Sequence, residues 1–231
     1  MPSCVGINKK KSISVGERTF NQLNSEKLAA LKKGKANFSN TFIEFKRTMG
    51  SDKKYHSSFM ETDFSSEDLS SEVLKKLKSF VQNDSFKSVV ITIPAMFNDN
   101  QKSATQKSAE LAGFSQVELL QEPIAAAMAY GLDEKVKDGQ ILIFDFGGGT
   151  FDVCLVNVED GIMQVKDTEG DNWLGGKNLD NAVVDEILIS YLKENYTIDS
   201  FLEDENKKAL LKDALKVKAE EIKINLSFSK S

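Results

Sequence analysis

Short runs of apolar residues recur along this chain, and several of them predict strands. The clearest run, 88–93, is continuous and β-branched, and it ends at Pro94. A run of this kind is typical of a strand that is buried on both faces. Alternating patterns and turn residues predict further short strands and hairpins. The predicted strands are 3–7, 12–15, 88–93, 117–120, 140–145, 151–158 and 162–165.

Helical spacing of apolar residues separates these strands. Ser65 and Asp68 form a capping-box pattern, and apolar residues at helical spacing follow it to Val81. Pro123 begins an alanine-rich helix that Gly131 closes, because proline favours the first helical turn and glycine the position after the last. Residues 51–64 are polar and predict an irregular segment. The remaining predicted helices are 25–33, 40–49, 100–111, 178–191 and a long last helix that contains Leu210, Leu211, Leu215 and Ile222.

This order of strands and helices indicates an α/β protein with two lobes. The boundary is predicted near residue 138, between the alanine-rich helix and the glycine hairpin. In the first lobe, residues 1–85 are expected to be mostly a peripheral subdomain and a connecting helix, and 86–138 the core. In the second lobe, 139–177 are expected to form core hairpins and 178–231 helices that lead into a truncated peripheral subdomain.

Composition narrows the range of partners. The net charge is −5, which argues against nucleic acid, because phosphate backbones require clustered Lys and Arg. No run of 18 or more apolar residues predicts a membrane span, and the first residues do not resemble a signal peptide, so the cytoplasm is the expected compartment. Cys4 and Cys154 lie in apolar runs and are expected to be buried thiols, and His56 is expected at the surface.

The sequence 145–152, Asp-Phe-Gly-Gly-Gly-Thr-Phe-Asp, carries the strongest chemical signal. Three glycines let the backbone approach a ligand closely, and successive N–H groups in such a turn can form an anion-binding nest. Asp145 and Asp152 are carboxylates of the kind that Mg²⁺ takes while it keeps several waters. A plain hairpin with a glycine bulge is the alternative. The flanking Asp145, Thr150 and Asp152 favour phosphate and metal.

Two further signals are less specific. Glu122 precedes the helix that begins at Pro123, so it is either a helix cap or a carboxylate that faces metal-bound water. Lys46 and Arg47 form a basic pair, which taken alone is more typical of surface charge than of a site.

Several motifs in the same order resemble the nucleotide-binding domain of the DnaK-type 70-kDa heat-shock chaperone family. The resemblance covers most of the chain from about residue 40 onward. It implies an actin-like, ribonuclease-H-like ATPase of two lobes that close over Mg-ATP. The motifs that carry it are 89–99, 122–132, the glycine turn, Leu174-Gly175-Gly176 and Leu179-Asp180-Asn181.

The resemblance also implies roles for individual residues. Lys46, Asp145, Glu122 and Thr150 match catalytic positions, with Lys46 near the attacking water. Asp145 and Asp152 match metal-associated carboxylates, and Glu122 matches a carboxylate that acts through water. Pro94 matches a proline that couples nucleotide state to a peptide-binding domain. The matched nucleotide-binding positions are Gly147, Gly148, Gly149, Thr150, Gly175, Gly176, Glu220, Lys223 and Ser227.

The cofactors implied are ATP or ADP with Mg²⁺, and K⁺ is a further candidate ion. The partners implied are a J-domain co-chaperone, a nucleotide-exchange factor and a peptide-binding domain that this chain does not contain. Neither nucleic acid nor membrane is expected.

The chain departs from the family pattern at its N-terminal side. The family's first phosphate hairpin, of Asp-Leu-Gly-Thr-Thr type, does not occur in this sequence, and Met1-Pro2-Ser3-Cys4-Val5 resembles the segment after it. The first lobe is therefore expected to be incomplete at its N-terminus and the second truncated at its C-terminus. Lys102 stands where many members have arginine. This chain alone is expected to be impaired in hydrolysis.

Two other interpretations stay open at this point. The same fold class includes filament-forming proteins and sugar kinases, and fold alone does not separate these from a chaperone. A divergent, non-catalytic paralogue that only binds nucleotide is the other alternative.

Overall fold

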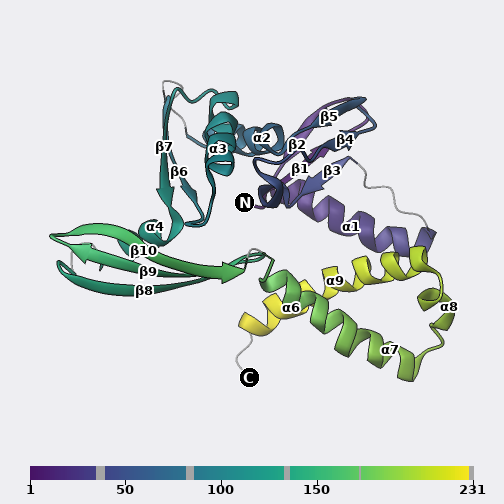
Figure 1. Ribbon diagram of the computed structural model, residues 1–231. Helices are drawn as coiled ribbons and strands as arrows, with labels where there is room; N and C mark the ends of the chain where they lie inside the picture. Colours follow the sequence, from purple (N-terminus) through teal and green to yellow (C-terminus); the bar gives the residue numbers. More distant parts are fainter. Residues whose placement is uncertain (35–39, 82–85, 133–135, 172, 229–231) are drawn as a thin grey trace.

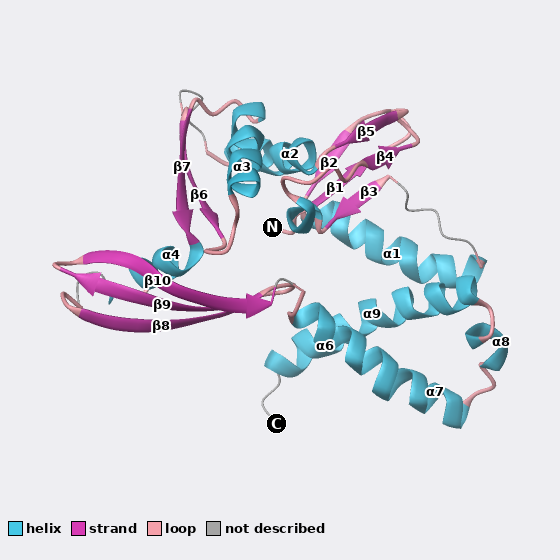
Figure 2. Ribbon diagram, viewed as in Figure 1, coloured by secondary structure: helices cyan, strands magenta, loops and turns pink. Residues whose placement is uncertain are grey.

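The structure is a computed structural model that describes residues 1–34, 40–81, 86–132, 136–171 and 173–228 (Figure 1). Residues 35–39, 82–85, 133–135, 172 and 229–231 lie outside the described part. Figure 2 shows the mixture of helices and strands that the sequence predicts. The strands form small, separate sheets, and the helices lie between and beside them.

The first sheet has the strand order β2-β1-β3, with both pairs antiparallel. It contains β1 (Cys4–Ile7), β2 (Ile13–Val15) and β3 (Thr41–Ile43). The predicted hairpin at 3–15 is therefore confirmed. The apolar core on this sheet consists of Val5, Ile7, Phe42, Phe45 and Leu69.

Helix α1 (Glu17–Lys33) begins eight residues before the predicted helix and ends at Gly34, whose φ of 63° is left-handed. It packs against the last long helix, α9 (Glu205–Phe228), so segments from the two ends of the chain lie side by side.

The prediction of a helix over 40–49 is wrong. This segment is β3 followed by a single 3-10 turn, η1 (Phe45–Thr48). The polar segment that follows is a small hairpin of β4 (Tyr55–Ser57) and β5 (Thr62–Phe64) rather than irregular chain. The predicted surface position of His56 is confirmed, because it is exposed on this hairpin and its Nδ1 lies 2.7 Å from Asp63 Oδ1.

Helices α2 and α3 both begin with the predicted chemistry. In α2 (Ser66–Lys78), Ser65 and Asp68 form the predicted capping box. In α3 (Asp99–Leu111), Asn98 and Gln101 form another, and Gly113 after its end has φ 83°.

A two-stranded parallel sheet carries β6 (Ser88–Ile93) beside β7 (Gln116–Gln121). The strand prediction at 88–93 is confirmed, but burial on both faces is wrong. Strand β6 has one neighbour among the described residues, and the Val90 side chain is 61% exposed.

The central sheet has the order β10-β9-β8 and is antiparallel. Its strands are β8 (Gly139–Phe146), β9 (Phe151–Glu159) and β10 (Ile162–Asp171), and β10 runs six residues further than predicted. One face of β9 is buried at Asp152, Cys154, Val156 and Val158 and is contacted by α4 (Glu122–Ala129). Both cysteines are buried free thiols, as predicted, and burial raises the pKa of Cys4 to about 11.

The predicted helix 178–191 is α6 (Gly176–Ala182), a π-helical turn η2 (Val183–Leu188) and α7 (Ile189–Asn195). A short helix α8 (Asp199–Leu202) leads to α9. Across the described segments, none of these helices has the length and hydropathy needed to cross a membrane.

Candidate functional site

A cleft of about 810 Å³ lies where η1, the glycine turn, the start of α4, α1 and α9 meet. The residues that line the cleft are far apart in sequence, because it lies between η1 and the β8–β9 turn. Of the predicted site residues, those that line it are Lys46, Glu122, Asp145, Gly147, Gly148, Gly149, Thr150 and Glu220; Pro94 lines it as well.

All four carbonyl groups of the glycine turn 147–150 accept hydrogen bonds from other groups of the protein. Gly147 N donates to Thr150 O, while the amides of Gly176 and Lys177 donate to the carbonyls of Gly147 and Gly148, each at 3.0 Å. The Gly149 carbonyl accepts from Arg47 Nη2 at 2.8 Å. The amides of residues 148–150, in contrast, donate to no acceptor in the described chain. Free amides on a cleft wall, with their carbonyls bonded elsewhere, are the arrangement of an anion nest.

Gly175 and Gly176 were predicted to bind nucleotide, but they lie behind the turn rather than along the cleft. Gly175 is buried, and a Cβ at this position would lie 2.4 Å from Gly149 N and 2.6 Å from the Gly148 carbonyl carbon. Gly175 and Gly176 pack against the glycine turn. A glycine is needed at 175 because two backbones pass at this distance.

Lys46 lies at the centre of an acidic group. Its Nζ donates to Glu122 Oε1 at 2.8 Å. Asp145 and Asp152 are directly paired across β8 and β9, so their side chains share a face. Burial raises the pKa of Asp152, the charges of Glu122 and Asp145 raise it further, and Lys46 lowers it in part.

Asp152 is 4% exposed and its Oδ1 has no hydrogen-bond partner among the described residues. A buried carboxylate beside two others is favourable only with a cation nearby. No group of three or more His, Cys, Asp or Glu in the described chain is close enough to hold a metal ion directly. The donors nevertheless fit a Mg²⁺ ion that takes one or two carboxylates and reaches the others through water.

This arrangement predicts that Asp152→Asn stabilises the ligand-free chain. A carboxyl whose pKa is raised by folding destabilises the folded state at pH above that pKa, and this penalty disappears as the pH falls. At pH 7.5 we expect Asn to raise Tm by about 2–4 °C, which corresponds to about 1 kcal/mol. Thermal melts by circular dichroism test this, and the gain should vanish near the ordinary pKa of 3.8. An unchanged or lower Tm of Asp152→Asn at pH 7.5 would contradict this prediction.

The two remaining predicted positions lie on α9 and do not line the cleft. Lys223 Nζ pairs with Asp180 Oδ1 at 2.7 Å and lies 3.4 Å from Gly176 O. Ser227 is exposed, and its hydroxyl donates to Lys223 O within the helix. Of the three predicted positions on α9, Glu220 lines the cleft, and Lys216 and Val217 of the same helix line it as well.

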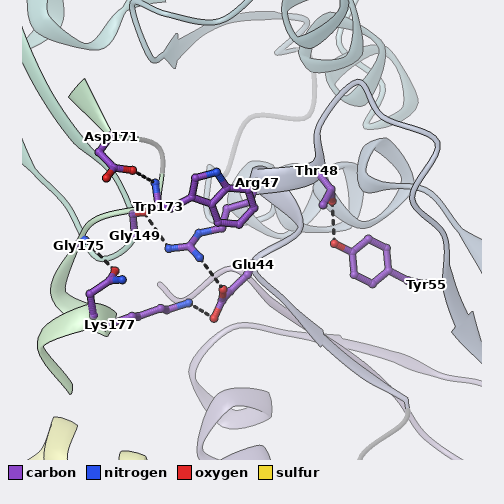
Figure 3. Close-up of polar contacts among 10 residues, drawn as sticks. Glu44, Arg47, Thr48, Tyr55, Gly149, Asp171, Trp173, Gly175 and Lys177 are labelled. Carbon is purple, nitrogen blue, oxygen red and sulfur yellow. Dashed lines mark hydrogen bonds and ion pairs between the residues drawn. The ribbon is translucent and has the colours of Figure 1, made fainter. Parts of the chain in front are cut away.

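Among the cleft-lining residues that sequence reasoning did not identify are Glu44, Trp173, Lys177 and Lys216. Sequence reasoning also favoured surface charge for Arg47, which is wrong. Figure 3 shows Arg47 between Gly149, Trp173 and Glu44. Glu44 lies three residues before Arg47, and Trp173 is the single tryptophan, immediately before Leu174-Gly175-Gly176. Their closeness in sequence to Arg47 and to the Leu174-Gly175-Gly176 motif was the signal that could have identified Glu44 and Trp173 as site residues.

The mixed sheets and helices, with a glycine turn, a lysine and carboxylates around one cleft, define an α/β protein with a phosphate-type nest. A family model described as Hsp70 protein matches residues 1–231. The chain is 38% identical over 231 residues to the chaperone protein DnaK of Thermosipho africanus, a match that covers 98% of this chain. It is 35% identical over 232 residues to the chaperone protein DnaK of Methanothermobacter thermautotrophicus.

This chain therefore belongs to the Hsp70 protein family. Membership brings with it the actin-like ATPase fold, and the family binds ATP or ADP, generally with Mg²⁺. The chain spans about a third of the length of these relatives, 35% in each case.

Proposed function

We propose that this chain is the nucleotide-binding module of an Hsp70-type chaperone and that it binds Mg-ATP and Mg-ADP in the cleft at 147–150. The observation that carries the proposal is the set of free amides at residues 148–150, whose carbonyls all accept hydrogen bonds from within the protein. Lys46 and the carboxylates of Glu122, Asp145 and Asp152 lie beside them, which supports a magnesium-bound phosphate chain.

Each residue has a role in this proposal. The amides of 148–150 hold phosphate oxygens, and Thr150 adds a hydroxyl. Lys46 neutralises charge at the terminal phosphate and orients water there. Asp145 and Asp152 hold Mg²⁺, with Glu122 acting through a water molecule; the metal supplies charge neutralisation for the phosphates when it is bound. On α9, Glu220, Lys223 and Ser227 bind the adenosine side, with Lys223 released from Asp180.

The wider activity is also part of the proposal. Two lobes, divided near residue 138, close over the nucleotide, and its binding and hydrolysis drive peptide binding by a domain outside this chain. A J-domain co-chaperone and a nucleotide-exchange factor regulate that cycle in the cytoplasm. The sequence 1–231 contains one glycine phosphate turn, so we propose that this chain by itself binds nucleotide but is impaired in hydrolysis.

One alternative function is consistent with the same site. A divergent paralogue that binds nucleotide without catalysis would have the same nest and the same carboxylates. Membership of the Hsp70 family argues against the filament-forming and sugar-kinase interpretations.

Thermal melts with nucleotide test the proposal. A ligand that binds only the folded state stabilises it by RT ln(1 + [L]/Kd), which is about 2.7 kcal/mol at 100 times Kd. For a chain of 231 residues we expect Mg-ADP at that excess to raise Tm by about 5–10 °C. ADP with a metal chelator should give less than half of this shift. Equal melts with and without Mg-ADP at millimolar concentration would contradict the proposal.

A further inference from the structure

Four side chains connect the two walls of the cleft, and we call them the cross-cleft bracket: Glu44, Arg47, Trp173 and Lys177 (Figure 3). Glu44 and Arg47 lie at η1, where the first sheet ends. Trp173 and Lys177 flank the segment Leu174-Gly175-Gly176 in sequence, and both line the cleft beside the glycine turn. Residues more than a hundred positions apart thus meet at one point.

Arg47 is the centre of the bracket. Its Nη2 donates to Gly149 O at 2.8 Å, and its guanidinium carbon lies 5.2 Å from the centre of the Trp173 ring. A Cβ at Gly149 would lie 2.5 Å from Arg47 Nη2, so only glycine permits this approach. The guanidinium therefore contacts the phosphate turn directly, with an aromatic face beside it.

Glu44 is held in a sparsely populated backbone conformation. Its φ is 62° and its ψ 12°, a left-handed region that costs a non-glycine residue about 1 kcal/mol. Its carboxylate pairs with Lys177 and lies 3.5 Å from Arg47 Nη1. Burial raises the pKa of Glu44, but the hydrogen bond from Lys177 and the charges of Lys177, Arg47 and Lys216 outweigh it, and the pKa is lowered. The strained backbone of Glu44 thus occurs at the residue whose carboxylate pairs with Lys177 across the cleft.

The bracket acts on the orientation of one peptide group. A peptide unit is planar, and its C=O and N–H point in opposite directions. Because Arg47 holds the Gly149 carbonyl, the N–H of Thr150 is fixed facing away from Arg47. The amides of Gly176 and Lys177 fix the preceding two peptide groups in the same way. Arg47 thus completes the orientation of the three amides of the nest.

The bracket is partly open to solvent. All four side chains line the cleft and are still partly exposed, from 21% for Arg47 to 63% for Trp173. A ligand bound in the cleft against the glycine turn would therefore lie beside the bracket.

We propose that Glu44, Arg47, Trp173 and Lys177 are positioning residues that orient the phosphate turn and slow the departure of bound nucleotide. This inference rests on the proposed function. High ionic strength should weaken the bracket, since salt screens half-exposed ion pairs such as those of Glu44 with Lys177 and Arg47.

The test is the dissociation rate of a fluorescent N-methylanthraniloyl-ADP from the whole 231-residue chain with Mg²⁺, chased with unlabelled ADP. Arg47→Met should speed dissociation about tenfold, because it removes a charge-assisted hydrogen bond. Glu44→Gln and Trp173→Leu should each speed it about threefold. Arg47→Lys should restore part of the loss, since it keeps the charge without the planar fork. The matched control is Glu72→Gln, which breaks a surface pair with Lys75 outside the cleft and should change the rate less than 1.5-fold.

Two readouts separate positioning from a general loss of structure. The fluorescence of Trp173 reports the bracket without any nucleotide, and Arg47→Met should make it more accessible to acrylamide. Raising the salt concentration should speed dissociation from the unaltered chain more than from Glu44→Gln. If Arg47→Met fails to fold, Glu44→Gln gives the same test. Bound probe that leaves all bracket variants at the unaltered rate would overturn this inference alone, and a chain that does not bind the probe would overturn the proposed function with it.

Discussion

Gly175→Ala is expected to abolish nucleotide binding and to destabilise the folded chain. A Cβ at this position would lie within 2.6 Å of three backbone atoms of Gly148 and Gly149. Backbone has no rotamer with which to move aside, so the turn itself must shift. Overpacking of this kind costs about 2–3 kcal/mol, and Tm should fall by about 5–10 °C. The displaced amides should lose at least two charge-assisted hydrogen bonds to phosphate, a loss of at least about 100-fold in affinity.

The matched control for this substitution is the next residue. A Cβ at Gly176 would meet Lys223 Nζ at 3.4 Å, which is the flexible end of a side chain. Gly176 is also the first residue of α6, where alanine is favourable. Gly176→Ala should therefore change Tm by less than about 2 °C. Calorimetric titration with Mg-ADP measures the binding; affinity within threefold of the unaltered chain in Gly175→Ala would mean that the turn is not supported from behind.

Lys46→Met is expected to weaken Mg-ATP binding about 10–30-fold and Mg-ADP binding less than threefold. The proposed place of Lys46 is at the terminal phosphate, which ADP lacks, and one charge-assisted contact contributes about 1.5–3 kcal/mol. In the ligand-free chain the lysine is paired with Glu122 and also lowers the pKa of Asp152. Its removal leaves three carboxylates without a compensating cation among them.

The control is Lys53→Met, an equal change of charge at an exposed residue outside the cleft. It should leave both affinities unchanged within about 1.5-fold. Equal losses for ATP and ADP in Lys46→Met would place the lysine away from the terminal phosphate. The same pair tests turnover: phosphate release by the unaltered chain that Lys46→Met abolishes would contradict the proposed impairment of hydrolysis.

Local chemistry made many elements of this fold predictable. The capping box at Ser65 and Asp68, the proline at the start of α4 and the apolar run of β6 each determine a local structure within a few residues. The β8–β9 hairpin was predictable because two apolar strand patterns flank a short run of glycines, which are poor strand formers and typical of a turn. Interactions between neighbours in sequence were sufficient in these cases.

Long-range interactions determined the elements that were missed. Residues 41–43 have helical spacing with their neighbours, but they pair with β1 some 37 residues earlier, and this ladder overrides the local pattern. The tight turn η1 then follows because Thr48 is bonded to Tyr55 and Ser66, residues from two other elements. Burial of β6 on both faces was mispredicted because an apolar run specifies a strand and not the number of its neighbours.

The residues of the candidate site also fall into those that local sequence identified and those that depend on long-range contacts. Residues whose chemistry is unusual in its local context, such as the glycine turn with its two aspartates, were identified from sequence. Arg47 and Glu44 were not, because their partners Gly149 and Lys177 lie more than a hundred residues away. The backbone contact of Gly175 was not predicted, because a glycine that approaches backbone cannot be told in sequence from one that approaches phosphate.

The central claim is that the amides of residues 148–150 bind the phosphates of a nucleotide. The most direct test is a ¹H–¹⁵N spectrum of the chain titrated with Mg-ADP, followed by amide hydrogen exchange. The account predicts that the amides of Gly148, Gly149 and Thr150 shift downfield together, saturate with one Kd and exchange more slowly when ADP is bound. The amides of Gly34 and Gly161, in turns outside the cleft, should not move. Saturable binding that leaves the amides of 148–150 unshifted and unprotected would contradict it.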